Sequence, residues 1–179
     1  MKIKLTFLGL VLAIVVFVSA CASTVTDDDT FDSVAGIPEV LHALQNPDDW
    51  VILDVRTRAE YEGVDAGTMG VFGFGRIAGA VHIEWSEAVD AAGQLLPEVE
   101  LLELYSEVLD GRSIIVYCRS GARSSHTLAV LNDLGADVLN FEGSWIEWSY
   151  AASASSSFPD RDLVLSFTEA WTDIAPLLP

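Results

Sequence analysis

Residues 113–124 read SIIVYCRSGARS, and this stretch decides how the rest of the chain is interpreted. The run up to Tyr117 is almost entirely apolar, which is typical of a strand buried inside a parallel sheet. Apolar residues at helical spacing follow over Ser124–Leu134, and Gly135 then supplies a common helix end. The stretch therefore predicts a buried strand, a tight loop and a helix, with Cys118 where the loop begins.

The loop that follows this strand has the composition of an anion site. A helix N-terminus presents backbone N–H groups and the positive end of the helix dipole. Gly121 can take a positive φ, which lets successive N–H groups converge on one point. Arg119 and Arg123 add positive charge, so the pKa of Cys118 should lie below its usual value of about 8.5. This pattern predicts a reactive thiolate, whereas an inert buried cysteine would have apolar neighbours.

Strands and helices alternate over the rest of the chain. Helices are expected over Ile37–Gln45 and Pro97–Leu109, and strands over Trp50–Leu53, Val81–Ile83 and Asp137–Phe141. Such alternation predicts an α/β fold with a central, mainly parallel sheet flanked by helices on both faces. Ser149–Ser157 is rich in Ala and Ser and is expected to be a loop. Asp54 and Cys118 each follow an apolar strand directly, so both should lie on the rim where such sheets bind ligands.

Composition and charge exclude several functions. The 179 residues include 27 acidic and 9 basic side chains, for a formal net charge of −18, and 51% are hydrophobic. A globular domain is therefore expected, without a nucleic-acid partner, because phosphate binding needs a basic surface. Two cysteines are too few for a disulfide framework or a four-thiolate zinc site. His42, His82 and His126 lack the spacing of metal ligands, so we expect structural or surface histidines and no metal.

The first residues have the pattern of an export signal. Lys2 and Lys4 precede an apolar run over residues 5–18, and Val18–Cys21 follows with small residues. This ending resembles the bacterial lipoprotein box, in which the leader is removed before a cysteine that carries lipid. The resemblance implies a signal peptide over residues 1–20, a lipid on Cys21 and a tether over 21–33. The domain would then be extracytoplasmic, anchored to a membrane in the periplasm or at the cell surface. An uncleaved membrane anchor is the alternative, because about 20 apolar residues span a bilayer.

Four motifs, in order along the chain, resemble the rhodanese family of sulfurtransferases. They are the loop at residues 118–124, Leu53–Arg56 with Glu60-Tyr61 downstream, residues 75–83, and residues 141–148. The resemblance extends over residues 34–158 and implies a rhodanese-like domain there. The tail over 159–179 has enough apolar residues that we expect it to pack on the domain.

The resemblance also implies sulfur transfer by double displacement, which needs a nucleophilic cysteine and no cofactor. Cys118 would take the outer sulfur of an anionic donor such as thiosulfate and pass it to cyanide, a small thiol or a protein thiol. The residues expected to hold substrate and persulfide are Arg119, Ser120, Gly121, Ala122, Arg123 and Ser124. Arg119 and Arg123 either bind the anionic end of the donor or only pin the loop to acids, with Asp54 the leading candidate partner.

Asp54 and Arg56 match the pair that ends a strand in this family. We expect them to support the loop from beneath, and the alternative is a local ion pair that only holds the turn. Two features depart from the family pattern. Glu62–Phe74 is a glycine-containing insertion, whose Phe72 and Phe74 cover the site, contact a partner or simply pack. Arg76 stands where His is commoner, and it either adds charge near the donor or faces solvent.

The sequence is also compatible with other functions. The same fold can dock a protein partner without catalysis, or act as a stoichiometric persulfide carrier. Related folds that act on phosphate or arsenate, including phosphatases and arsenate reductases, carry Arg six positions after the cysteine. Here that position is Ser124, and Arg123 comes one residue earlier. The shorter loop suits a sulfur atom on Cys118 better than a bulkier phosphoryl group.

Overall fold

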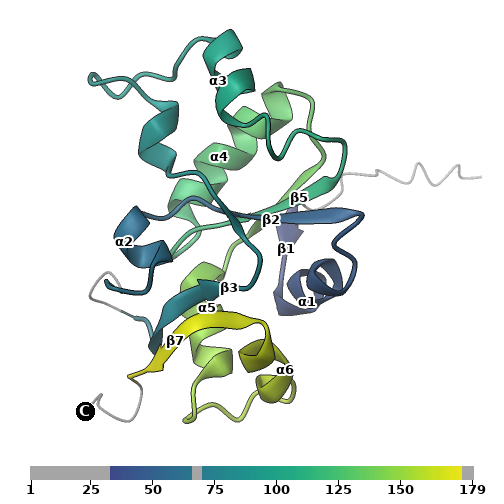
Figure 1. The fold of residues 1–179 in the computed structure, drawn as a ribbon, viewed down its shortest axis with the longest axis vertical. Helices are drawn as coiled ribbons and strands as arrows, with labels where there is room; N and C mark the ends of the chain where they lie inside the picture. The colour runs from purple at the N-terminus through teal and green to yellow at the C-terminus, as the bar shows by residue number, and fades with distance from the viewer. Residues whose placement is uncertain (1–32, 66–69, 175–179) are drawn as a thin grey trace, which may run out of the picture. The chain divides into compact units, whose positions relative to one another are not determined.

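A computed structural model describes residues 33–65 and 70–174 of the chain (Figure 1). The expected signal peptide, the lipid-bearing Cys21 and the tether lie outside the described residues, apart from Ser33. Across the two described stretches, no helix combines the length and the apolar character needed to cross a membrane.

Five parallel strands form the central sheet in the order β1-β6-β5-β2-β4. The strands are β1 Val34–Ala35, β2 Trp50–Asp54, β4 Val81–His82, β5 Ser113–Tyr117 and β6 Val138–Phe141. β5 pairs with β2 along its whole length, and this register sets Asp54 against Tyr117. The expected parallel sheet is thus confirmed, and the carboxyl ends of its two longest strands lie side by side.

Helices cover both faces of this sheet because side chains of the central strand alternate between the faces. Ile114 and Val116 pack on one face together with Cys118, and Ile115 and Tyr117 pack on the other. The first face is covered by α3 (Glu98–Leu104), α4 (Ala122–Asp133) and the 3-10 turn η1 (Trp85–Ala88). The second face is covered by α1 (Ile37–Gln45), α5 (Ser144–Ala152) and α6 (Arg161–Ser166) (Figure 1).

The helix expected over Ile37–Gln45 is confirmed at those bounds, with Pro38 in its first turn. Other boundaries differ. α3 ends at Leu104, five residues before the end that the apolar pattern indicated. The loop expected over Ser149–Ser157 is wrong in its first part, because α5 continues to Ala152. Burial of Trp148 and the small residues after it stabilises this last turn, and packing outweighs the weak helix preference of serine.

A second sheet, which the sequence did not indicate, joins the insertion to the tail. β3 (Gly73–Ile77) pairs antiparallel with β7 (Thr168–Asp173). The tail also buries Val164 completely, and Trp171 meets Trp145 edge-to-face with ring centroids 6.2 Å apart. The C-terminal segment therefore lies against the same core as α1 and α5.

The unusual residues of the insertion take part in this packing. Phe72 contacts Tyr150 edge-to-face at 4.9 Å between ring centroids, and Phe74 packs against the core. Arg76 forms an ion pair of 2.6 Å with Glu169 of β7. These aromatic side chains therefore pack within the fold, and Arg76 binds the tail instead of lying free in solvent.

Glycines at the base of the insertion allow the close approach of the tail. A Cβ on Gly73 would overlap the Trp171 ring and lie 2.7 Å from the Thr172 carbonyl oxygen. Gly75 has a φ of 132°, and its Cβ would lie 2.6 Å from the Glu169 carbonyl oxygen. These glycines are required because two backbones meet there.

Gly75→Ala should lower the free energy of unfolding by about 2–5 kcal/mol, because an unfavourable φ is added to a clash with Glu169. Gly79→Ala is the matched control, since Gly79 has a φ of 69° but nothing within 4 Å of its Cβ position. That control should lose only about 1–2 kcal/mol. Urea unfolding measures both losses, and equal values would contradict a tight contact between β3 and β7.

Candidate active site

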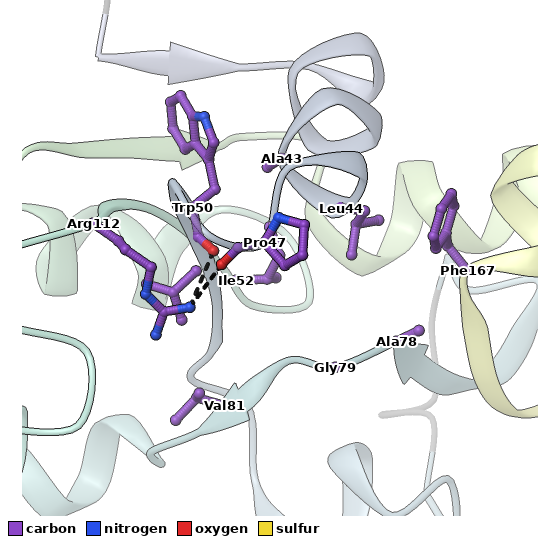
Figure 2. Close-up of a pocket in the computed structure, with 11 residues that line it drawn as sticks. Ala43, Leu44, Pro47, Trp50, Ile52, Ala78, Gly79, Val81, Arg112 and Phe167 are labelled. Carbon is purple, nitrogen blue, oxygen red and sulfur yellow. Dashed lines mark hydrogen bonds between the residues drawn. The ribbon is translucent and has the colours of Figure 1, made fainter. Parts of the chain in front are cut away.

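Two of the cavities in the described part of the chain differ in chemistry. One, of about 290 Å³, is mostly apolar and lies between the end of α1, the start of β2, residues 78–81 and Phe167 (Figure 2). Its charged residue, Arg112, donates to the carbonyl oxygens of Pro47 and Trp50 at 3.1 and 3.3 Å and pairs with Asp110 at 2.8 Å. Because these contacts already engage the guanidinium, this cavity offers little to orient a polar ligand.

The other cavity, of about 400 Å³, contains the nucleophile predicted from the sequence. Its lining consists of Thr57, Glu60, Asp65, Cys118, Arg119, Ser120, Ala122 and Arg123. Cys118 follows β5 directly and is 1% exposed, so its thiol is reached through this cavity. The cavity lies beyond the carboxyl ends of β2 and β5, and the expectation that Asp54 and Cys118 share one rim of the sheet is confirmed.

The loop after Cys118 is closed by Gly121 and Ser124. Gly121 is the N-cap of α4 with a φ of 88°, and a Cβ there would lie 2.7 Å from the Glu142 carbonyl oxygen. The Ser124 hydroxyl lies 3.6 Å from the Cys118 Sγ, within the range of a hydrogen bond to sulfur. Gly121 thus lets the loop turn back so that the start of α4 reaches the thiol.

The pKa of Cys118 reflects two opposing effects. Burial raises the pKa of the thiol, since it penalises the charged form. The N–H and hydroxyl of Ser124, the N–H of Ser120 and the charge of Arg123 all favour the thiolate, and together they outweigh burial. The pKa of Cys118 therefore lies below its ordinary value, which raises the fraction of nucleophilic thiolate at a given pH.

Arg123 is held by an acidic residue that the sequence alone does not assign to the site. Its Nη1 and Nη2 donate to the two carboxylate oxygens of Glu60 at 2.8 and 3.0 Å. Glu60 is buried and also accepts from the N–H of Thr57 at 2.9 Å. Burial raises the pKa of Glu60, but Arg123 and Thr57 outweigh it and lower the pKa to about 2.

The expected pairing of Asp54 with an arginine of the loop is therefore wrong for Arg123. The sequence did contain a signal for Glu60, because Thr57 and Glu60 have the spacing of a capping box. This box forms at the start of α2 (Arg58–Tyr61), and it fixes the Glu60 carboxylate on the cavity side of the helix.

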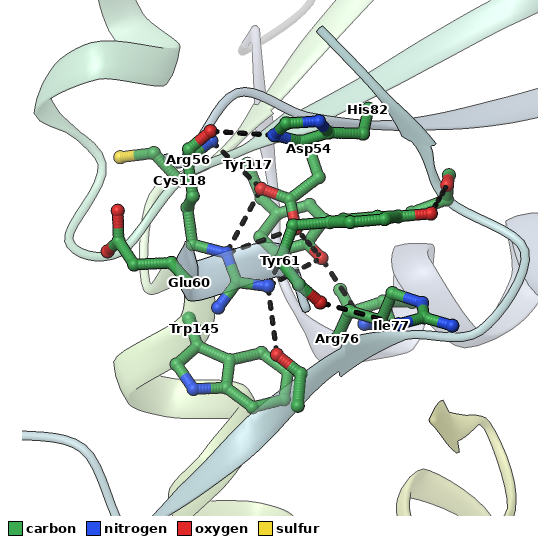
Figure 3. Close-up of polar contacts among 12 residues, drawn as sticks. Asp54, Arg56, Glu60, Tyr61, Arg76, Ile77, His82, Tyr117, Cys118 and Trp145 are labelled. Carbon is green, nitrogen blue, oxygen red and sulfur yellow. Dashed lines mark hydrogen bonds and ion pairs between the residues drawn. The ribbon is translucent and has the colours of Figure 1, made fainter. Parts of the chain in front are cut away.

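Asp54 instead forms a buried ion pair with Arg56 (Figure 3). The Arg56 Nη2 lies 2.6 Å from Asp54 Oδ2 and also donates to the Gly75 carbonyl oxygen at 3.0 Å. The guanidinium lies over the Trp145 ring, 4.6 Å from its centroid. Asp54 and Arg56 therefore form the local ion pair that was the alternative expectation for these residues. Arg56 also contacts Gly75 and Trp145, which lie far away in the sequence.

Tyr117 connects this ion pair to the second sheet. Its hydroxyl donates to Asp54 Oδ2 at 2.5 Å and accepts from the Ile77 N–H at 3.2 Å (Figure 3). Tyr117 precedes Cys118, so the position of the nucleophile depends on the same buried group of side chains. Burial raises the pKa of Tyr117 well above its ordinary value, which keeps the hydroxyl protonated as a donor.

The first turn of α5 fixes the peptide groups that follow Cys118. The N–H groups of Trp145 and Ile146 donate to the carbonyl oxygens of Cys118 and Arg119, each at 3.0 Å. In a trans peptide the C=O and N–H point in opposite directions. The N–H groups of Arg119 and Ser120 are therefore turned away from α5, and the Ser120 N–H bonds to the thiol.

Ser144, in the first turn of α5, also fixes the backbone of Cys118. It is fully buried and has a φ of 50°, which is uncommon for a residue other than glycine. Its hydroxyl accepts from the Cys118 N–H at 3.2 Å and donates to the Phe141 carbonyl oxygen at 2.7 Å. The sequence alone assigns no role to Ser144, because nothing local shows that α5 begins beneath Cys118.

His82, expected to be structural, has its Nε2 2.8 Å from the Arg56 carbonyl oxygen and stacks on Tyr61. Over residues 33–65 and 70–174, no group of three or more His, Cys, Asp or Glu side chains is placed to hold a metal ion.

Ser144→Gly should raise the pKa of the Cys118 thiol without unfolding the protein. Glycine adopts the φ of Ser144 without strain, which offsets part of the cost of losing a buried hydroxyl, so stability should change by no more than about 1 kcal/mol. The Cys118 N–H loses its acceptor and the loop becomes less well fixed. The pH dependence of Cys118 alkylation, followed by peptide mass spectrometry, reports the pKa.

Ser149→Ala is the matched control, since it removes another buried hydroxyl of α5 that bonds to Ile146 and Phe72 and not to Cys118. The pH at the midpoint of Cys118 alkylation should rise in Ser144→Gly and stay unchanged in Ser149→Ala. Identical midpoints in all three proteins would show that Ser144 does not influence the thiol.

Comparisons with known proteins agree with this geometry. Residues 37–151 match the family profile of the rhodanese-like domain. The thiosulfate sulfurtransferase of Corynebacterium glutamicum is 36% identical over 121 residues, which cover 64% of this chain and 40% of that protein. The sulfur carrier protein TtuD of Thermus thermophilus is 35% identical over 130 residues, covering 68% of this chain and 43% of that protein. The chain therefore spans less than half the length of these curated relatives.

A solved structure shows the same fold. The anaerobic ergothioneine biosynthesis enzyme from Chlorobium limicola, in complex with trimethyl histidine, superposes with a TM-score of 0.62 at 23% identity. The match covers 66% of this chain and 30% of that one. The family match extends over more than half of the chain and includes strands β2, β4, β5 and β6 of the parallel sheet and the Cys118 loop. This chain belongs to the rhodanese-like domain family.

Proposed function

We propose that this protein is a sulfurtransferase that carries a sulfane sulfur on Cys118. The observation that carries the proposal is a thiol of lowered pKa at the floor of an open cavity, surrounded by N–H groups and Arg123. Such a thiolate is a nucleophile, and the same donors can stabilise the anionic persulfide that it forms. The relative named thiosulfate sulfurtransferase supports this chemistry.

The reaction has two displacements. The Cys118 thiolate attacks the outer sulfur of a donor such as thiosulfate, a new S–S bond forms, and the donor's S–S bond breaks as sulfite leaves with the electron pair. An acceptor then attacks the terminal sulfur of the persulfide and releases the Cys118 thiolate. Cyanide becomes thiocyanate in this step, and a thiolate becomes a persulfide. Atoms and charge balance in both steps without an added oxidant.

The residues around Cys118 have different roles in sulfur transfer. The persulfide is bound by the loop residues Arg119, Ser120, Gly121, Ala122, Arg123 and Ser124, mainly through backbone N–H groups. Arg119 interacts with the anionic end of the donor. Arg123 stabilises the thiolate while it stays paired with Glu60. Asp54 and Arg56 hold the strand ends behind the loop and do not touch the substrate.

A stoichiometric sulfur carrier is a second candidate, favoured by the resemblance to TtuD. A carrier needs the same persulfide but hands its sulfur to a protein thiol. A phosphatase or arsenate reductase is less well supported, because Ser124 occupies the position where those folds have arginine and Arg123 is bound by Glu60.

We also propose that the chain is exported and anchored to a membrane by lipid on Cys21. The support comes from the sequence alone: two lysines, an apolar run and the residues of Val18–Cys21. The remaining domain would then act on sulfur compounds outside the cytoplasm.

Incubation with thiosulfate should add one sulfur atom to Cys118, measured as a gain in intact mass that is lost when cyanide is added. Cys118→Ser should gain no sulfur, because a hydroxyl does not form a persulfide. Repeated thiocyanate formation indicates an enzyme, and a single round of transfer to protein thiols alone indicates a carrier. No adduct with any sulfane donor would contradict sulfur transfer and favour a docking module.

The lipid anchor is tested by expressing the full chain in a bacterial host. The wild-type protein should appear in the membrane fraction with a lipid on Cys21 and without residues 1–20, whereas Cys21→Ser should carry no lipid and keep its leader. Sulfur loading of Cys118 should be the same in both proteins. Equal membrane association without lipid would indicate an uncleaved apolar anchor instead.

A further inference from the structure

We infer that Glu60 makes this site select sulfur donors of low net charge, of the class of zwitterionic amino-acid persulfides, over dianionic thiosulfate. The inference rests on the proposed function, since it assumes that Cys118 accepts a sulfane sulfur. It assigns the class of donor and the residue that sets the choice.

Charges of both signs line the cavity in equal number. Glu60 and Asp65 are acidic, and Arg119 and Arg123 are basic. Their formal charges cancel, and the Cys118 thiolate then adds one negative charge. A dianionic donor would have to enter a site without net positive charge, in a chain whose formal net charge is −18. Both the local and the long-range field oppose that step.

Glu60 has the strongest effect among these charges because it is fixed and ionised. Its side chain is 6% exposed and receives two hydrogen bonds from Arg123, at 2.8 and 3.0 Å. The N–H of Thr57 holds the same carboxylate at 2.9 Å, so the carboxylate cannot swing away from the cavity. Its pKa of about 2 keeps it charged at any physiological pH. The positive charge of Arg123 is therefore largely neutralised before a donor arrives.

A zwitterionic persulfide suits this arrangement better than a dianion. Arg119, which is half-buried, and Asp65, which is exposed, supply one charge of each sign at the cavity wall. The donor's carboxylate and ammonium groups can face these opposite charges, and the net charge of the occupied cavity changes little. A volume of about 400 Å³ lies in the range of small-molecule sites.

The chemical step balances for such a donor. The Cys118 thiolate attacks the outer sulfur of R–S–SH and forms a new S–S bond. The S–S bond of the donor breaks, and its inner sulfur leaves as a thiolate with the electron pair. The transferred sulfur gives up its hydrogen as a proton, so that Cys118 carries the anionic persulfide of the proposed function. One anion is consumed, two anions and one proton are released, and no oxidant is needed.

The test compares thiosulfate with cysteine persulfide on the full-length protein. The rate of sulfur loading on Cys118 is measured by peptide mass spectrometry and divided by the rate at which each donor loads free glutathione. Wild type should show the higher normalised rate with cysteine persulfide. Glu60→Gln should raise the rate with thiosulfate about tenfold, because one negative charge is removed beside the thiolate. The same variant should change the rate with cysteine persulfide much less, so the ratio of the thiosulfate rate to the cysteine persulfide rate should rise several-fold. A change in the Cys118 thiolate itself would alter both rates together and leave that ratio unchanged.

Glu62→Gln is the matched control. It removes the same charge two residues further along the chain, from an exposed side chain that does not line the cavity. The rates with thiosulfate and with cysteine persulfide should each change by less than about twofold. Asp65→Asn provides a second variant at the cavity wall, on an exposed residue, in case Glu60→Gln weakens α2. It should also raise the rate with thiosulfate.

Two results would overturn the inference. If Cys118 is loaded but thiosulfate rates stay unchanged or fall in both Glu60→Gln and Asp65→Asn, donor choice does not depend on these charges. If wild type, normalised in the same way, prefers thiosulfate, the assigned donor class is wrong. Failure to load Cys118 with either donor would instead contradict the proposed function, and the inference would fall with it.

Discussion

The buried ion pair of Asp54 and Arg56 is the interaction on which the surroundings of Cys118 depend. Two opposite charges inside a protein are costly unless every polar atom finds a partner. Here Arg56 donates to Asp54 and to the Gly75 carbonyl oxygen, and Tyr117 donates to Asp54. All hydrogen bonds of the pair form only when the ends of β2 and β5 meet β3, so a shift of β3 or β5 would leave the buried pair without one of its hydrogen-bond partners.

Reactivity and selectivity at Cys118 arise from different groups. The N–H groups of Ser124, in α4, and of Ser120, whose peptide is oriented by the first turn of α5, favour the thiolate over a short distance. Arg123 contributes in the same direction, but Glu60 cancels much of its charge toward an approaching anion. The site therefore favours the thiolate form of Cys118 without becoming a strong general receptor for anions. Backbone N–H groups at a helix N-terminus can favour the thiolate in this way because their electrostatic effect falls off within the first helical turn.

The C-terminal tail, which lies outside the residues that match the family, holds β3 against the site. The family match ends at residue 151, and β7 begins at Thr168. β3 is held from inside by Arg56 and by the Trp145 Nε1, which donates to the Gly73 carbonyl oxygen at 3.0 Å. From outside it is held by β7. The insertion and the tail therefore form one structural unit, in which glycine on one strand accommodates the backbone of the other.

The sequence by itself determined the parallel sheet and the chemistry of the Cys118 loop. A strand buried on both faces must be continuously apolar, and the residues that make the anion site are contiguous around Gly121. Only the tertiary structure decided the roles of Glu60 and Ser144 and the existence of the second sheet. The partners in these contacts are 63 residues apart for Glu60 and Arg123, 26 for Cys118 and Ser144, and 93 for Arg76 and Glu169. Contacts at such separations leave no periodic pattern in the chain, because they depend on how whole elements pack.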